Sequence, residues 1–288
     1  MSVAGPSTIG ALLRAARRDL AAAPFDPETR EASLLLSHVL GRGEASLLAY
    51  PEEPVGAALV ERFRRLLARR LTGEPVAYLF GEREFYGRPF AVDPRVLIPR
   101  PETEHLIEAA LALPLPAQLR IVDVGTGSGC IAITLALEIP GARLLATDVS
   151  LAALQVARAN ARRHGVAERV RFVQGDLAGA LRLPHIDLLV SNPPYVALDT
   201  EEISPEVKGF EPHQALFAAD HGRSILRRLI EQAESLPAAA HLIVEIGYDQ
   251  GGWIEAVTQG RDPWHEAELI HDYAALPRTV VLRRATAD

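Results

Sequence analysis

Hydrophobic residues recur at helical spacing through the first quarter of the chain. Over residues 8–23, and again over residues 32–40, they fall on one face of a helix, with charged residues largely elsewhere. Asp26, which is followed by a proline, has the form of a helix start for the second segment. A third helix is expected over about residues 55–71. The pattern therefore predicts a small helical domain over residues 1–74.

A different pattern follows this domain. Residues 75–81 and 85–92 are short, aromatic and interrupted by glycine, which predicts a β-hairpin. They lead into residues 97–104, Leu-Ile-Pro-Arg-Pro-Glu-Thr-Glu, where two prolines flank an arginine before a helix start. Residues 75–100 are expected to form a connector that also borders a site, although a plain linker fits their composition equally well.

Strands and helices alternate beyond residue 119. The predicted strands cover residues 120–124, 143–148, 170–174, 186–190, 242–245, 267–270 and 279–283. The predicted helices cover residues 130–137, 152–164, 223–234 and 252–257. Such alternation predicts a mainly parallel, doubly wound sheet in an α/β domain over residues 101–288.

The interval over residues 196–222 shows no predicted element. Loops beyond roughly 12–15 residues without structure of their own are usually functional or disordered. Because this interval directly follows the polar corner described next, we interpret it as a loop that covers the substrate.

Residues 191–195, Ser-Asn-Pro-Pro-Tyr, end the predicted strand over residues 186–190. Two prolines forbid the strand to continue and make a stiff corner at its carboxyl end. The side-chain oxygen of Asn192 and the carbonyl of Pro193 can each accept one hydrogen of a planar NH2 group, and Tyr195 can lie against its flat face. On its own the motif is more often a simple turn, but other features point to a site.

Those features follow the three preceding strands. Three glycines, at positions 125, 127 and 129, directly precede the helix over residues 130–137. Because glycine has no side chain, they permit a ligand to approach the backbone. This spacing departs from the dinucleotide fingerprint G-x-G-x-x-G. Asp148 follows the first of these glycines at about the spacing, roughly 20 residues, that is expected for an acid that binds ribose hydroxyls.

Asp176 ends the third strand, where it can accept from an adenine amino group while Leu177 covers the ring. Each acid alone is more often a turn or cap residue. Their succession at strand ends predicts one crevice for a nucleoside, as is typical of open α/β sheets. A nucleoside site beside a corner that holds an amide indicates methyl transfer from S-adenosylmethionine, which has no phosphates. Because an alkylated amide is very acidic, no strong general base is needed.

Composition limits the remaining possibilities. The 288 residues are 48% hydrophobic and 23% charged, as in globular proteins, and the net charge of −7 argues against binding along a nucleic-acid backbone. A single cysteine, Cys130, excludes an internal disulfide and fits a reducing compartment. Without a long apolar N-terminal segment, we expect a cytoplasmic protein with no membrane span. The nine histidines show no close metal-ligand spacing, so no metal is expected.

Two arginine pairs, Arg64-Arg65 and Arg69-Arg70, lie in the third predicted helix. Such runs usually form solvated helix faces, and we expect that here.

Taken together, these residues resemble the HemK/PrmC family of bacterial glutamine methyltransferases, which modify peptide-chain release factors. The resemblance covers nearly the whole chain. The matching segments are residues 75–81, 97–104, 123–129, 192–195, 211–216 and 245–251, with Asp148 and Asp176.

The resemblance implies transfer of methyl from S-adenosylmethionine to the glutamine side chain in the Gly-Gly-Gln motif of class 1 release factors, leaving S-adenosylhomocysteine. It implies a seven-stranded Rossmann-like methyltransferase domain behind an N-terminal helical bundle with a connecting hairpin. We also expect a monomer that binds no nucleic acid directly. The implied cofactor residues are Gly125, Thr126, Gly127, Ser128, Gly129, Asp148, Asp176, Leu177 and Asn192. The implied substrate residues are Asn192, Pro193, Pro194 and Tyr195, with Asn192, Pro193 and Tyr195 catalytic.

Two positions depart from the family pattern. Leu177 stands where an aromatic residue often packs on adenine, and residues 272–278 lack an expected glycine.

Three alternatives remain open from the sequence. A related glutamine methyltransferase of a large-subunit ribosomal protein would use the same corner, so the N-terminal domain must discriminate between the two. A methyltransferase of exocyclic amines in DNA or RNA fits the corner, but the acidic charge opposes it. A cofactor-binding scaffold without catalysis would not need Asn192.

Overall fold

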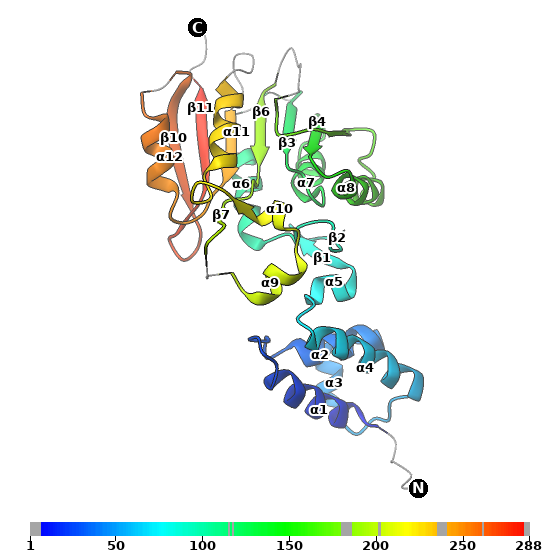
Figure 1. Ribbon diagram of the computed structural model, residues 1–288. Helices are drawn as coiled ribbons and strands as arrows, with labels where there is room; N and C mark the ends of the chain where they lie inside the picture. Colours follow the sequence, from blue (N-terminus) through cyan, green and yellow to red (C-terminus); the bar gives the residue numbers. More distant parts are fainter. Residues whose placement is uncertain are drawn as a thin grey trace. The chain divides into compact units, whose positions relative to one another are not determined.

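The computed structural model describes residues 7–114, 116, 118–179, 186–200, 203–234, 241–260 and 262–284. The chain forms two compact units (Figure 1). The helical unit comprises Met1–Gly81 and Glu201–Phe210, and the sheet unit comprises Glu82–Thr200 and Glu211–Asp288. These bounds differ from the expected division, because the hairpin belongs to the sheet unit and a part of the interval over residues 196–222 belongs to the helical unit.

The helical unit is built on a core of leucines with Ile9 and Phe63. Its helices are α1 (Ile9–Ala21), α2 (Glu31–Leu40), α3 (Glu44–Ala49), α4 (Ala57–Leu71), α5 (Val76–Phe80) and α9 (Pro205–Phe210). The helical domain is confirmed, but α3 was missed. The expected start of α2 at Asp26 is wrong, because the helix begins at Glu31, whose buried carboxylate pairs with Arg70 of α4.

The expectation of a strand over residues 75–81 is also wrong. These residues contain α5, because this turn of helix places Tyr78 and Leu79 together on its buried side.

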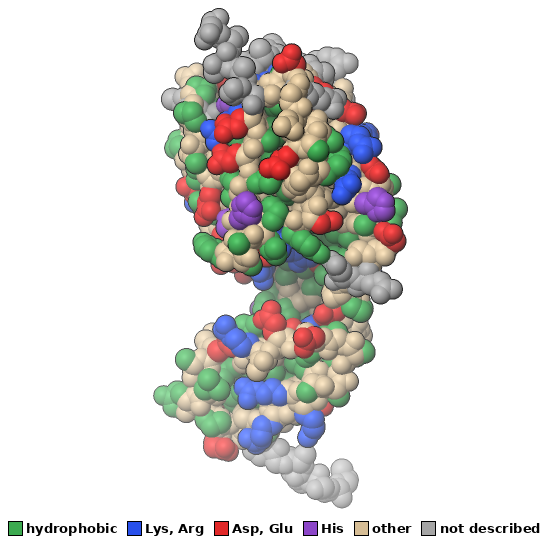
Figure 2. All heavy atoms as spheres, turned by 90° about the vertical axis from the view of Figure 1, so that its left-hand side faces the viewer, with side chains coloured by type: hydrophobic (Ala, Val, Ile, Leu, Met, Phe, Trp, Pro, Cys, Tyr) green, Lys and Arg blue, Asp and Glu red, His purple; other side chains and the backbone are tan. Residues whose placement is uncertain are grey.

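Charged side chains of both signs lie on the surface of the helical unit. Figure 2 shows basic and acidic side chains interspersed with hydrophobic ones on the face that it draws. In α4, Arg64, Arg65 and Arg69 are exposed as expected. For Arg70 the expectation is wrong, since the residue is only 3% exposed. Its guanidinium is held by two carboxylates and the ring of Phe25.

The sheet unit contains a seven-stranded sheet with the order β10-β11-β9-β6-β3-β4-β5. Its strands are β3 (Arg120–Val124), β4 (Arg143–Asp148), β5 (Val170–Gln174), β6 (Leu188–Ser191), β9 (His241–Glu245), β10 (Trp264–His271) and β11 (Pro277–Arg284). The strands from β9 to β5 pair in parallel, while β11 pairs antiparallel with β9 and β10. The mainly parallel sheet is thus confirmed.

Helices cover both faces of this sheet (Figure 1). One face carries α6 (Glu104–Ala112), α7 (Cys130–Glu138) and α8 (Leu151–Arg163), and the other carries α11 (Ser224–Glu234) and α12 (Gly251–Thr258). Successive residues of a strand point to opposite faces. Accordingly, Ile121 joins the core under α6 and α7, and Val122 joins the core under α11 and α12.

The hairpin is formed by β1 (Glu82–Phe85) and β2 (Arg88–Ala91), and the 3-10 helix η1 (Pro101–Thr103) follows it. Phe85 and Phe90 are fully buried in the core under α6 and α7, which explains why the hairpin is part of the sheet unit. Asn160 of α8 exchanges hydrogen bonds of 2.8 and 3.0 Å with the backbone of Ala91, and donates a third of 2.9 Å to the carbonyl of Ser128. This one side chain joins the hairpin to the glycine-rich turn.

The expectation of a loop without structure over residues 196–222 is wrong. This interval contains β7 (Val196–Ala197), α9, α10 (His213–Leu216) and β8 (Phe217–Ala218), and β7 pairs in parallel with β8. None of these elements exceeds six residues, so none carries a detectable period.

The turn between β10 and β11 shows how this segment adopts its conformation without the glycine expected from the family pattern. The Asp272 carboxylate accepts hydrogen bonds of 2.8 and 3.0 Å from the backbone N–H groups of Ala274 and Leu276. These bonds hold Ala275 at φ 61°, a conformation that favours glycine.

Among the described helices, none is long and apolar enough to cross a membrane.

Candidate active site

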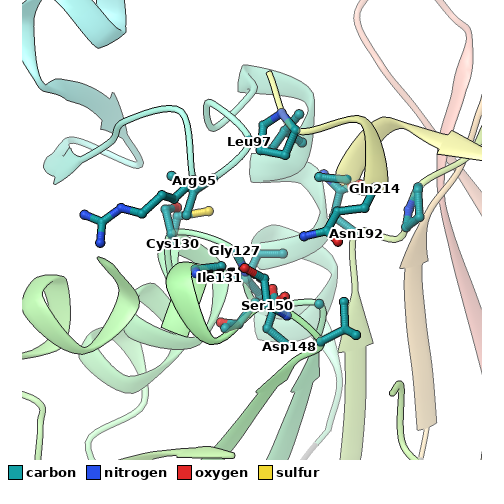
Figure 3. Close-up of a pocket in the computed structure, with 18 of the residues that line it drawn as sticks. Arg95, Leu97, Gly127, Cys130, Ile131, Asp148, Ser150, Asn192 and Gln214 are labelled. Atoms are coloured by element: carbon teal, nitrogen blue, oxygen red, sulfur yellow. Dashed lines mark hydrogen bonds between the residues drawn. The ribbon is translucent and has the colours of Figure 1, made fainter. Parts of the chain in front are cut away.

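A pocket opens at the carboxyl edge of the sheet unit (Figure 3). The ends of four adjacent parallel strands line it, through the turn after β3, Asp148 at the end of β4, Leu177 after β5 and Asn192 after β6. The crevice predicted from successive strand ends is therefore present. In Figure 3, Asn192 lies beside Gln214 on one side of the pocket, and Asp148 lies below with Ser150.

The glycine-rich turn leaves room over its backbone. Gly125 and Gly127 have φ angles of 73° and 54°, and a Cβ added at either position would meet no atom within 4 Å. Both residues line the pocket, together with Thr126 and Ser128. The open space is of the kind that a ligand lying against the backbone requires.

Asp148 is fixed by this turn. Its two oxygens accept hydrogen bonds of 2.9 and 2.8 Å from the backbone N–H groups of Gly127 and Ser150. Burial raises the pKa of the Asp148 carboxyl, while these two bonds act in the opposite direction. A hydroxyl-bearing ligand in the pocket would meet a pre-oriented acceptor.

Asp176 and Leu177 border the pocket, but they follow β5, which ends at Gln174, so Asp176 does not end this strand as expected. The Asp176 side chain is 62% exposed and forms an ion pair of 2.5 Å with Arg228 of α11. Leu177 has φ 54° and its carbonyl accepts a hydrogen bond of 3.3 Å from the Thr147 hydroxyl.

The Asn-Pro-Pro-Tyr corner follows β6 and is held by side chains from distant parts of the chain. The Asn192 amide nitrogen donates to the Thr103 hydroxyl at 3.0 Å, and that hydroxyl donates to the Glu245 carboxylate at 2.5 Å. The Tyr195 hydroxyl donates to the other Glu245 oxygen at 2.9 Å. Gln250 donates to the carbonyl of Tyr195 at 3.2 Å. The corner is therefore held by hydrogen bonds within the protein itself.

Of the predicted corner residues, Asn192 and Pro194 line the pocket, whereas Pro193 and Tyr195 are not among its lining residues. Tyr195 faces the buried Glu245 through its hydroxyl. Gly129, the third glycine of the turn, is also outside the lining.

Glu245 is 1% exposed at the end of β9. Burial raises its pKa, and the hydrogen bonds from Thr103 and Tyr195 oppose that shift. The negative charge of Glu245 in turn raises the pKa of the Tyr195 hydroxyl well above its ordinary value. The sequence analysis did not assign Thr103 or Glu245 to the site, although both lie in segments that carry the family resemblance, residues 97–104 and 245–251.

The proline-rich entry borders the pocket as expected, through Leu97, Pro99 and Arg100. The buried Glu211 holds this segment in place. Its oxygens accept a hydrogen bond of 3.0 Å from the Ile98 N–H and one of 2.6 Å from the Arg100 guanidinium.

Cys130 is buried where α7 begins, and burial raises the pKa of its thiol to about 12. The thiol is therefore protonated at neutral pH, and the residue both packs in the core under α6 and α7 and lines the pocket.

Comparison with known proteins agrees with these features. Residues 11–81 match the family described as PrmC N-terminal domain, and residues 103–206 match the methyltransferase small domain. The chain is 43% identical over 282 residues to the release factor glutamine methyltransferase of Nitratidesulfovibrio vulgaris, and covers 96% of both chains. It is 42% identical over 276 residues to that of Koribacter versatilis, covering 94% of this chain and 97% of the relative.

Among solved structures, the hMettl16 catalytic domain in complex with MAT2A 3′UTR hairpin 6 is similar with a TM-score of 0.57. The sequences are 18% identical, and the match covers 76% of this chain and 81% of the other. At this identity the likeness shows the fold alone.

The seven-stranded mixed sheet, the pocket at its carboxyl edge and the small-domain match define an S-adenosylmethionine-dependent methyltransferase. Within that class, the chain belongs to the PrmC/HemK family of release factor glutamine methyltransferases. The resemblance drawn from the motifs is thus confirmed.

Proposed function

We propose that this chain methylates the glutamine side-chain amide of the Gly-Gly-Gln motif in class 1 peptide chain release factors. The observation that carries the proposal is the Asn192 corner, which presents an amide at the pocket lined by the glycine-rich turn and Asp148. The names of full-length relatives at 42–43% identity support the substrate.

The pocket fits S-adenosylmethionine, which supplies the methyl group when bound. Open space over Gly125 and Gly127 suits a ligand against the turn, and the Asp148 carboxylate suits ribose hydroxyls. Asp176 and Leu177 suit the adenine, although the Arg228 ion pair competes for the Asp176 carboxylate. The remaining cofactor residues under the proposal are Thr126, Ser128, Gly129 and Asn192.

The chemical difficulty is the nucleophile, because an amide nitrogen shares its lone pair with the carbonyl. Under the proposal, the Asn192 side-chain oxygen and the Pro193 carbonyl accept the two hydrogens of the substrate amide. This orients the nitrogen and favours the positive charge that develops on it. Pro194 and Tyr195 complete the substrate site, and the proton of the alkylated amide leaves without a strong base.

The direct test is transfer of labelled methyl from S-adenosylmethionine to a purified release factor. A copy with the Gly-Gly-Gln glutamine replaced, a ribosomal-protein fraction and duplex DNA are assayed beside it. We expect label on the intact factor alone. Label only in the ribosomal fraction would keep the chemistry and overturn the partner, and label on the duplex would favour the nucleic-acid alternative.

A substitution separates the corner from the cofactor pocket. Asn192→Ala is expected to remove most methyl transfer, a loss of at least about 100-fold, while calorimetry shows cofactor binding largely intact. Gln259→Ala, which removes an exposed amide outside the pocket lining, is the matched control and is expected to keep full activity. An active Asn192→Ala enzyme would refute the assigned role.

We further propose that the protein works in the cytoplasm as a monomer. The single buried cysteine supports a reducing compartment. Light scattering on the purified chain tests the monomer.

A further inference from the structure

The hydroxyl of Thr103 lies between two groups of the site. It donates to Glu245 at 2.5 Å and accepts from the Asn192 amide nitrogen at 3.0 Å. A threonine hydroxyl has one hydrogen to give and lone pairs to accept with. The direction of each bond therefore depends on its partner.

Glu245 determines that direction. Its two oxygens accept from separate hydroxyls, those of Thr103 and Tyr195, and an ionised carboxylate can only accept. Burial raises the pKa of the Glu245 carboxyl, while the two hydroxyl hydrogen bonds and the charge of Arg278 act in the opposite direction. Because the two Glu245 oxygens are each occupied by a donating hydroxyl, Thr103 gives its single hydrogen to Glu245, and only lone pairs remain for Asn192.

An amide has one side that donates and one side that accepts. Since Thr103 can only accept from Asn192, the NH2 group of Asn192 must face Thr103. Its oxygen is then the polar atom left for the pocket that Asn192 lines. A flipped amide would place two acceptors against each other at Thr103 and would offer N–H groups to the substrate.

We propose that Glu245 is a positioning residue that acts through Thr103 to fix which side of the Asn192 amide faces the substrate. The inference rests on the proposed function, because only an amino-bearing substrate requires an acceptor there. The Glu245 carboxylate touches no reacting atom and works through a hydrogen-bond relay of two links.

Replacement of Glu245 by glutamine inverts the relay with little change in shape. The new amide oxygen can accept from Tyr195 while its NH2 group donates to Thr103. The Thr103 hydroxyl is then free to donate to the Asn192 oxygen, which turns the Asn192 NH2 group toward the pocket.

The experiment measures kcat and KM for the release factor, direct binding of S-adenosylmethionine, and thermal unfolding. Glu245→Gln is expected to lower kcat/KM at least about 30-fold, with cofactor affinity within about threefold and the fold retained. Thr103→Val, which removes the hydroxyl, is expected to match that loss. Thr103→Ser, which keeps the hydroxyl, is expected to stay within about threefold of the unchanged chain.

The double variant Thr103→Val with Glu245→Gln gives a readout that a merely structural role would not produce. If Glu245 acts through Thr103, the double variant loses no more activity than Thr103→Val alone. Additive losses, or full activity of Glu245→Gln, would overturn the relay. If Glu245→Gln fails to fold, the contrast between Thr103→Ser and Thr103→Val decides, and equal activity of those two would overturn the relay.

Failure of the proposed function has a different signature. It would appear as absence of transfer by the unchanged chain to the release factor, before any variant is compared. Transfer by the unchanged chain with an unaffected Glu245→Gln enzyme would contradict the relay alone.

Discussion

Gly222 shows how closely single residues are fitted around the corner. A Cβ added there would lie 1.9 Å from the carbonyl oxygen of Tyr195, and the residue has φ 78°. Gly222→Ala is therefore expected to destabilise the protein by more than about 2 kcal/mol, because backbone must move on both sides. Displacement of the Tyr195 carbonyl should lower methyl transfer as well. Denaturant unfolding and the transfer assay measure the two effects.

Gly252→Ala is the matched control. Gly252 lies in α12 with no atom within 4 Å of an added Cβ, so alanine is expected to stabilise the protein by about 0.5–1 kcal/mol. A Gly222→Ala variant as stable as the unchanged chain would contradict the geometry of this contact.

At the same scale, the sequence predicted those site residues that end or directly follow a strand. Asp148 and Asn192 belong to this group, because the carboxyl ends of parallel strands meet at one edge. Thr103 and Glu245 were not found as site residues, since their hydrogen bond joins positions 142 residues apart and no local pattern records such a pair.

Among the elements, long periodic segments were predicted and short ones were not. The strands β3, β4 and β5 lie where expected. The helices α3, α5, α9 and α10 have four to six residues, too few to show a helical period, and their formation depends on tertiary contacts.

The packing of α2, α4 and α9 depends on Arg70. This guanidinium pairs with the buried Glu31 at 2.6 Å and with Glu206 at 2.5 Å. Removal of one partner of a buried pair leaves an uncompensated charge. Arg70→Ala is therefore expected to destabilise the helical unit by about 3–5 kcal/mol. Hydrogen exchange of the α2 and α4 amides in the full chain measures the effect.

The neighbouring Arg69 offers a matched control. Its side chain is 52% exposed and pairs with Glu74 at the surface, so Arg69→Ala is expected to change stability by less than about 1 kcal/mol. Equal exchange rates in the two variants would contradict this prediction, because the buried Arg70 pairs would then stabilise the protein no more than the exposed Arg69 pair.

In the whole sheet unit, the strand order explains where the site forms. The chain builds β3, β4 and β5 outward in one direction, then returns to place β6 on the other side of β3. Ligands bind at such a reversal in open α/β sheets, and here Gly125 and Asn192 follow the two strands concerned. Alternation along the sequence predicted the sheet but not its order, because hydrophobic periods do not record which strands pair.

The stability of the whole protein should carry a pH signature from Asp123 in β3. This carboxyl is completely buried, and burial raises its pKa from 3.8 to about 7. Between these values the folded protein keeps a proton that the unfolded chain has released. Its stabilising contribution is therefore greatest at low pH and is lost as pH rises through about 7.

Asp123→Asn removes this titration while keeping a similar shape. Relative to the unchanged chain, the variant is expected to gain stability as pH rises from about 5 to about 7, by roughly 1.4 kcal/mol per pH unit at most. Urea unfolding at each pH measures the difference. Asp272→Asn serves as control, because its Arg278 partner lowers the pKa of that carboxyl and its titration lies below this window.

The slope of stability against pH is decisive in this comparison, rather than the offset between the two curves. An offset is expected in any case, since the amide introduced by Asp123→Asn would face the side where Asp123 Oδ1 now has no hydrogen-bond partner among the described residues. Parallel curves for the variant and the unchanged chain would mean that Asp123 is ionised in the folded protein throughout. Its hydrogen bonds with Thr126 and Ala132 would then outweigh the effect of burial.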